Sequence, residues 1–147
     1  MKTRIKIFFS TILSLCLILA TVCPTTAAST GGVMPLYNNT SATATNMNIN
    51  DNGLMTISYQ YSGYPSKTTK AVITTYIEKR TLGIFWSRVD IGTDSDQWVD
   101  VINDYRYTGY RTFQLSAKGT YRVVVNYTIY GTGGAADVIP YEAKDSY

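Results

Sequence analysis

Residues 120–130, TYRVVVNYTIY, decide the fold class of this chain. Two interleaved sets alternate along the stretch, namely Tyr121, Val123, Val125, Tyr127 and Ile129 in one set and Arg122, Val124, Asn126, Thr128 and Tyr130 in the other. A period of two residues is that of a β-strand with one face in the core. The GTGG sequence that follows is typical of a turn. The stretch therefore predicts a strand with one buried face.

Segments of similar character occupy most of the remaining chain. They are residues 41–49, 54–61, 70–79, 85–91, 98–102, 110–117 and 138–143. In the second of these, Met55, Ile57, Tyr59 and Tyr61 share one face, and Thr56, Ser58 and Gln60 share the other. Turn signals such as NDNG at 50–53 separate the segments. Pro140 would confine the last segment to a sheet edge or a bulge.

This pattern predicts an all-β fold. The spacing of strands and turns is that of an antiparallel β-sandwich of seven to eight short strands, with a small barrel as the alternative. Both cysteines, Cys16 and Cys23, lie within the first 28 residues, so the domain is expected to contain no disulfide. Its apolar core would then have to supply the stability.

The N-terminal 28 residues have the features of a secretory signal peptide. Lys2, Arg4 and Lys6 precede the apolar stretch 7–22, and Thr26-Ala27-Ala28 offers small residues for cleavage. The apolar stretch is shorter than the ~20 residues that a spanning helix needs. We therefore expect a secreted protein without stable membrane insertion after cleavage. A lipid-anchored or signal-anchored form is the alternative, because Ala20-Thr21-Val22-Cys23 loosely resembles a lipoprotein box.

Domain organisation and charge follow from this cleavage. We expect a signal peptide at 1–28, a flexible leader at 29–40 and a single β-sandwich domain at 41–147. The precursor has a net charge of +3, and removing the three basic residues of the signal segment leaves ten basic against ten acidic residues. A neutral domain is not expected to bind nucleic acid, whereas self-association remains possible.

Residues 115–121, LSAKGTY, resemble the tyrosine corner of immunoglobulin-like and fibronectin type III domains. There a leucine packs over the corner and the phenol six residues later bonds to upstream backbone, which implies structural roles for Leu115 and Tyr121 in an immunoglobulin-like sandwich. The position of the usual proline is taken by Ala117. The chain also resembles uncharacterised small secreted proteins of Gram-positive bacteria in Ile77-Glu78-Lys79, in Trp86 with Val89, and in 118–123, KGTYRV. That likeness implies no activity.

The residues offer little for catalysis or for a cofactor. The chain has no histidine, and the only glutamates are Glu78 and Glu142. We therefore expect a protein that is not an enzyme and has no cofactor. Five aspartates between 90 and 104 leave calcium as a possible ligand, with Asp94, Asp96 and Asp100 as the candidate carboxylates. The alternative is a solvated acidic loop in which aspartates form turns.

Aromatic residues supply the candidate binding site. The sequence YRYTGYR at 105–111 lies between two predicted strands, and tyrosine and arginine recur at recognition surfaces. The candidate ligand-binding residues are Trp86, Tyr105, Arg106, Tyr107, Tyr110 and Arg111. The alternative is that these rings pack across strands within the sandwich.

Together these observations favour a secreted, non-catalytic β-sandwich that binds an extracellular glycan, a cell-wall polymer or another protein. A self-assembling structural protein is the first alternative, because exposed sheet edges can pair between copies. A small hydrolase or a secreted toxin is a weaker alternative.

Overall fold

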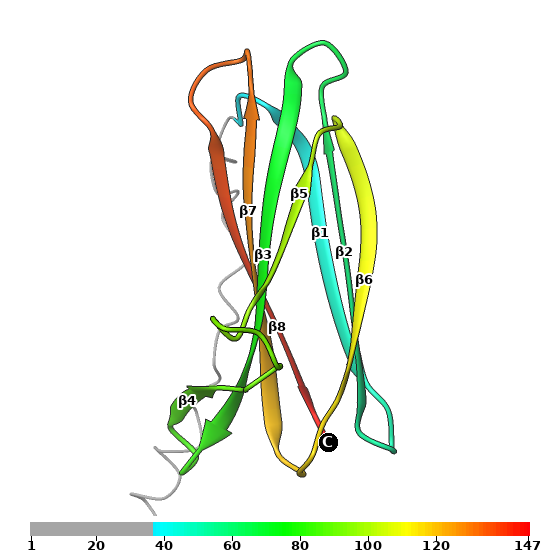
Figure 1. The fold of residues 1–147 in the computed structure, drawn as a ribbon, viewed down its shortest axis with the longest axis vertical. Coiled ribbons are helices and arrows are strands. Elements are labelled where there is room, and N and C mark those ends of the chain that lie inside the picture. The colour runs from blue at the N-terminus through cyan, green and yellow to red at the C-terminus, as the bar shows by residue number, and fades with distance from the viewer. Residues whose placement is uncertain (1–36) are drawn as a thin grey trace, which may run out of the picture. The chain divides into compact units, whose positions relative to one another are not determined.

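The computed structural model describes residues 37–147, and these form eight strands without a helix (Figure 1). The strands are β1 (Thr40–Ile49), β2 (Leu54–Gly63), β3 (Thr68–Thr81), β4 (Phe85–Arg88), β5 (Trp98–Ile102), β6 (Arg106–Gln114), β7 (Thr120–Gly131) and β8 (Asp137–Ser146). No helix in this part of the chain is long and apolar enough to cross a membrane. The predicted signal peptide and residues 29–36 of the predicted leader lie outside the described residues.

The strands form two antiparallel sheets, so the predicted β-sandwich is confirmed. The smaller sheet has the order β1-β2-β6, and the larger sheet has the order β4-β3-β7-β8, with β5 also paired to β3. With β1, β2 and β3 as strands A to C and β6, β7 and β8 as strands E to G, these are the A-B-E and C-F-G groups of the immunoglobulin fold. The short strands β4 and β5 both extend the larger sheet, because they pair with successive parts of β3.

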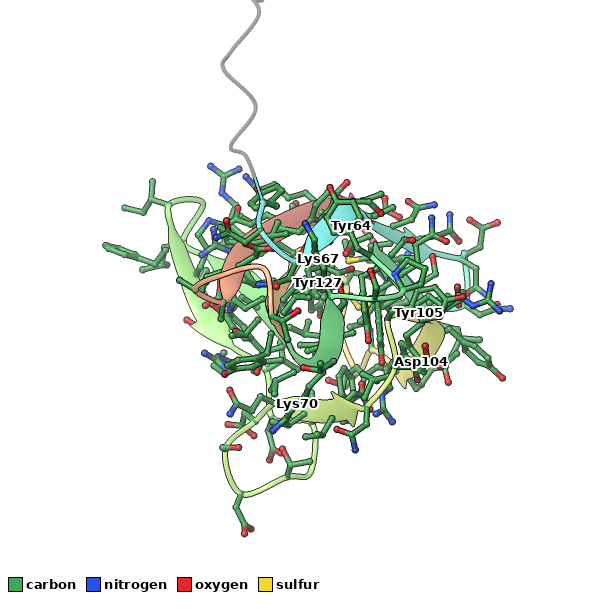
Figure 2. The ribbon with its side chains drawn as sticks, turned by 90° about the horizontal axis from the view of Figure 1, so that it is seen from above. Tyr64, Lys67, Lys70, Asp104, Tyr105 and Tyr127 are labelled. Atoms are coloured by element: carbon green, nitrogen blue, oxygen red, sulfur yellow. The ribbon has the colours of Figure 1, made fainter. Side chains whose placement is uncertain are left out.

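The core lies between the two sheets and follows the alternation of the strands. Met55, Ile57, Ile73, Val123 and Ile129 have no exposed surface. Tyr127 of β7 lies near the middle of the sandwich when it is seen from above (Figure 2). Its phenol oxygen lies 2.6 Å from the Thr45 hydroxyl oxygen and 2.9 Å from the Ala44 carbonyl oxygen, so the buried polar tip has partners on the opposite sheet.

The turn from β6 to β7 is closed by Tyr121. Its phenol donates a hydrogen bond to the carbonyl of Ala117, four residues upstream, and both Tyr121 and Leu115 are buried. The bond satisfies a carbonyl that the turn leaves without a ladder partner. In the strand order of the immunoglobulin fold this turn is the one between strands E and F, where a tyrosine corner is found.

The last residues of the predicted leader belong to the folded domain. Asp137, a buried residue of β8, accepts hydrogen bonds from the backbone amides of Asn38 (2.9 Å) and Asn39 (2.8 Å) and from the hydroxyl of Thr40 (2.9 Å). Tyr37 packs against the core. A buried carboxylate is stable only with such donors, so these bonds hold the chain against β8 before and at the start of β1.

Candidate binding face on the three-stranded sheet

The predicted aromatic cluster at 105–111 does not form one surface, and its expected position between strands is wrong. All but the first of its residues belong to β6, so successive side chains point to opposite faces of the smaller sheet. Arg106 and Tyr110 are exposed on the outer face, whereas Tyr107 and Arg111 are half-buried on the inner face. Tyr105 precedes the strand and is half-buried. Only part of the cluster can therefore meet a ligand on the outer face.

The outer face of the smaller sheet is polar and nearly uncharged. Registered pairs place Ala44 of β1, Gln60 of β2 and Thr108 of β6 in one row across the three strands. The rows on either side contain Ala42, Ser62 and Arg106, and Asn46, Ser58 and Tyr110. Among these nine residues Arg106 is the only charged one. Hydroxyl and amide groups therefore dominate the face.

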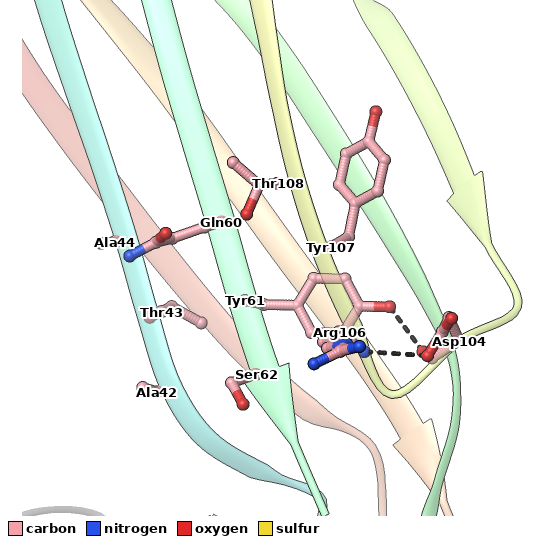
Figure 3. A pocket seen from close by; sticks show the side chains of 10 residues that line it. All are labelled: Ala42, Thr43, Ala44, Gln60, Tyr61, Ser62, Asp104, Arg106, Tyr107 and Thr108. Atoms are coloured by element: carbon pink, nitrogen blue, oxygen red, sulfur yellow. Dashed lines mark hydrogen bonds between the residues drawn. The ribbon is translucent and has the colours of Figure 1, made fainter. Parts of the chain in front are cut away.

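An open groove of about 600 Å³ lies over the part of this sheet near the end of β2 (Figure 3). Its lining residues come from β1, β2, the start of β6 and the preceding loop, and are Ala42, Thr43, Ala44, Gln60, Tyr61, Ser62, Asp104, Arg106, Tyr107 and Thr108. The hollow forms because the side chains of Ala42, Ala44, Ser62 and Thr108 are small. Gln60 and Arg106 supply its longer polar groups.

A second hollow of about 280 Å³ continues the groove along the sheet. It shares Ala44, Gln60 and Thr108 with the first and extends to Asn46 and Ser58. The next outward residue on β6 is Tyr110, which lies opposite Ser58 and has 74% of its surface exposed. From Arg106 to Tyr110 the strand advances by about 13 Å, so the two hollows and the ring form one elongated surface.

The loop before β6 is tied to the groove through Tyr61. The Tyr61 phenol donates to the backbone carbonyl of Asp104 at 2.7 Å, and the backbone amide of Arg106 donates to the Asp104 carboxylate at 3.3 Å (Figure 3). Burial, assisted by the nearby Asp104 charge, raises the pKa of Tyr61 to about 12. The phenol therefore stays neutral at physiological pH and keeps this hydrogen bond.

On the inner face Asp100 joins the two sheets at their open edge. The Tyr59 phenol donates to one carboxylate oxygen of Asp100 at 2.6 Å, and the Arg111 guanidinium donates to the other. Burial, and then the hydrogen bond to Asp100, raise the pKa of Tyr59 above its ordinary value. Arg111 thus has a bridging contact within the protein and is not a free ligand-binding group.

The three aspartates considered for calcium are not brought together. Asp100 lies in β5 and its oxygens are occupied by Tyr59 and Arg111, whereas Asp94 and Asp96 lie in the loop before that strand. Within residues 37–147 no group of three acidic, histidine or cysteine side chains is arranged to hold a metal ion. Calcium binding remains a prediction without a built site in this part of the chain.

Trp86 lies on the other sheet. It pairs with Arg80 at the edge of the larger sheet, and its ring lies beneath Arg122, whose guanidinium carbon is 4.6 Å from the ring centroid. Trp86 therefore does not join Tyr110 and Arg106 in a single site. Its half-buried ring packs on the outer face of the larger sheet.

The structure adds Gln60, Asn46, Ser58 and Thr108 to the candidate site, and the sequence-based selection did not include them. A signal was present, because Thr56, Ser58 and Gln60 already form the polar face of an alternating strand. What the chain does not reveal is which strands lie beside that face. The hollow arises only when the small residues of β1 and β6 align with Gln60.

No protein-family model matches the chain, and no curated protein matches it in sequence. The chemistry of the site is therefore inferred from its geometry. The face offers hydrogen-bond donors and acceptors and one exposed aromatic ring. It can hold a hydroxyl-rich ligand in position, and the described residues around it include no histidine or cysteine that could act as a nucleophile or base.

Proposed function

We propose that the protein is an exported, non-catalytic binding module that holds an extracellular glycan on the outer face of β1, β2 and β6. The observation that carries the proposal is the elongated hollow beside the exposed ring of Tyr110, whose polar side chains are uncharged except for Asp104 and Arg106 at one end. Sites that bind by recognition alone need such a concave, pre-formed surface with a few polar groups to fix orientation.

The state of the polar groups supports an external partner. Four exposed side chains of the face make no hydrogen bond to any other residue of the described domain, and they are those of Gln60, Asn46, Ser58 and Thr108. In the free protein they are hydrogen-bonded to water. A ligand with many hydroxyl groups exchanges these bonds without leaving a buried polar group unpaired.

The charge of the face favours a neutral polymer over a polyanion. Arg106 is the single charged side chain in the three rows, so there is no field to attract a phosphate-rich chain. The exposed Tyr110 ring offers a flat apolar surface on which a sugar ring can stack. Its position beside the hollows places that stack in line with the amide and hydroxyl groups.

The test is retention on polysaccharides. The protein is incubated with insoluble peptidoglycan, chitin and cellulose, and the fraction retained on each polymer is measured. On a polymer that binds the wild type, Tyr110→Ala is expected to lower the affinity by about 30-fold. The matched control is Tyr130→Ala, which removes an exposed tyrosine from the outer face of the larger sheet. Equal retention of wild type and Tyr110→Ala on every polymer that binds would contradict the proposal.

Self-assembly is the second candidate, and the larger sheet gives it support. Val99, Val101 and Val138 are each more than half exposed on its outer face. Strand β6 also pairs only with β2 among the described strands, which leaves one edge open. Concentration-dependent oligomers in sedimentation, dispersed by Val101→Lys, would favour this function over glycan binding.

A further inference from the structure

The hairpin between β3 and β4 carries three strongly exposed apolar residues, and one of them, Leu82, is the most exposed large apolar residue of the described domain. Leu82 is 87% exposed, Ile84 69% and Phe85 59%. They are consecutive but for Gly83, and they lie at the end of the sandwich where β3 finishes (Figure 1). Exposed apolar groups collected at one projecting tip mark a surface that meets a partner.

The backbone conformation of the turn does not favour a leucine at position 82. The amide of Ile84 donates to the carbonyl of Thr81 at 3.2 Å, and the two residues between them, Leu82 and Gly83, have φ values of 51° and 74°. Turns of this kind favour asparagine before glycine, because a leucine side chain is disfavoured in the left-handed region. The hairpin therefore keeps an exposed leucine where a polar residue would fold better.

Positive charge lies directly behind the apolar tip. Lys79, Arg80 and Arg88 belong to the same hairpin, and none of them makes an ion pair with another described residue. The nearest glutamates, Glu78 and Glu142, are both hydrogen-bonded to Arg122. Arg88 donates to the backbone carbonyl of Asp96 at 3.4 Å and lies over the Tyr76 ring, so the acidic loop meets the hairpin at Arg88, whereas Arg80 is exposed next to the tip.

We propose that this hairpin docks the protein on an anionic lipid bilayer, a role independent of the proposed glycan site. Leu82, Ile84 and Phe85 would enter the interfacial region, and Lys79 and Arg80 would face the headgroups. Strand β4 has four residues, fewer than the ~9–11 of a spanning strand, so the contact is peripheral. A second copy is a poorer occupant, because two tips that meet would bring like charges together.

The experiment mixes the full chain with vesicles of phosphatidylcholine alone or with added phosphatidylglycerol. Because residues 7–22 are themselves apolar, docking is measured at the hairpin, where Phe85→Trp introduces an indole into a chain whose Trp86 and Trp98 are replaced by phenylalanine. We expect its emission to move to shorter wavelength with the anionic vesicles, less with the neutral ones, and to return toward the free value in high salt. Soluble glycerol phosphate should cause no shift, because a headgroup without a bilayer offers no apolar layer.

Leu82→Asn, added to the Phe85→Trp chain, separates docking from folding. Asparagine tolerates the left-handed backbone, so the melting temperature is expected to rise by roughly 4 °C while the emission shift is lost. The control is Val138→Thr, which removes an apolar side chain that is 64% exposed from β8 and should leave the shift intact. An unchanged shift in Leu82→Asn, or no shift with anionic vesicles, would overturn the proposal. Oligomers in lipid-free sedimentation that Leu82→Asn abolishes would overturn it in favour of a second copy.

Discussion

The outer faces of the two sheets meet water in different ways. On the larger sheet Arg122 donates to Glu78 at 2.5 Å and to both carboxylate oxygens of Glu142 at 3.1 and 3.2 Å, and its guanidinium covers the Trp86 ring. On the smaller sheet the side chains of Gln60, Asn46, Ser58 and Thr108 make no hydrogen bond within the described domain. A face whose polar groups are already paired contributes to stability. A face whose polar groups are paired only with water is available to a ligand.

Alkaline pH should have the largest effect on the stability of the domain. The groove face rests on Tyr61, whose pKa is raised to about 12 by burial, whereas the unfolded chain has a tyrosine pKa near 10. Between pH 10 and 12 the unfolded state therefore loses this proton first. Tyr61 alone is expected to lower the free energy of unfolding by about 1.4 kcal/mol per pH unit in that window, or about 3 kcal/mol in all.

Urea unfolding at pH 7, 10, 11 and 12 measures this loss, with Tyr61→Phe as the comparison. The variant lacks the bond to the Asp104 carbonyl and should be less stable by about 1 kcal/mol at pH 7. Its stability should then fall less steeply above pH 10 than that of wild type. Parallel curves for the two proteins above pH 10 would show that Tyr61 does not titrate as its burial requires.

Breaking the ion pairs of the larger sheet should have the next largest effect. Arg122→Ala leaves Glu78, whose side chain is 14% exposed, without its partner and uncovers Trp86. We expect a loss of about 2 kcal/mol in the free energy of unfolding, below the value for a fully buried pair because Arg122 is partly exposed. Retention on polysaccharide should not change. A variant as stable as wild type would mean that this face is no more structural than the other.

Removing a polar group from the groove face should have the smallest effect on stability. Gln60→Ala deletes an exposed amide that has no partner among the described residues, so the free energy of unfolding should change by no more than about 0.5 kcal/mol. Glycan retention should fall nonetheless. A clear loss of stability would show that Gln60 supports the sheet, and the contrast between the two faces would then disappear.

Strands with a strict two-residue period were predicted well. Residues 120–130 and 54–61 correspond to β7 and β2, and residues 98–102 match β5. Pro140 lies in β8, which is an edge strand as predicted. For β7 and β2 the pattern suffices because burial of one face imposes the alternation directly on the chain. The edge position of β8 follows instead from Pro140, which has no N–H to donate to a neighbouring strand.

The prediction of a strand at 110–117 began four residues later than β6 does, because Gly109 within YRYTGYR is typical of a loop. In the structure Gly109 is paired with Tyr59 inside the sheet, and a side chain there would collide with the Tyr107 ring. The glycine makes room for an aromatic ring that packs back along its own strand. No local pattern distinguishes this use of glycine from its use in a turn.

The sequence by itself therefore determined the class of fold, the absence of a disulfide in the domain and the inward side of the strands with clear alternation. These properties depend on a residue and its near neighbours, because the burial of apolar side chains requires an alternating pattern within each strand. The tertiary structure alone decided that Arg106 and Tyr110 share a face with Gln60 while Tyr107 and Arg111 turn away, and that Asp100 lies between Tyr59 and Arg111. Those relations join residues far apart in the chain, and only the pairing register of the strands brings them together.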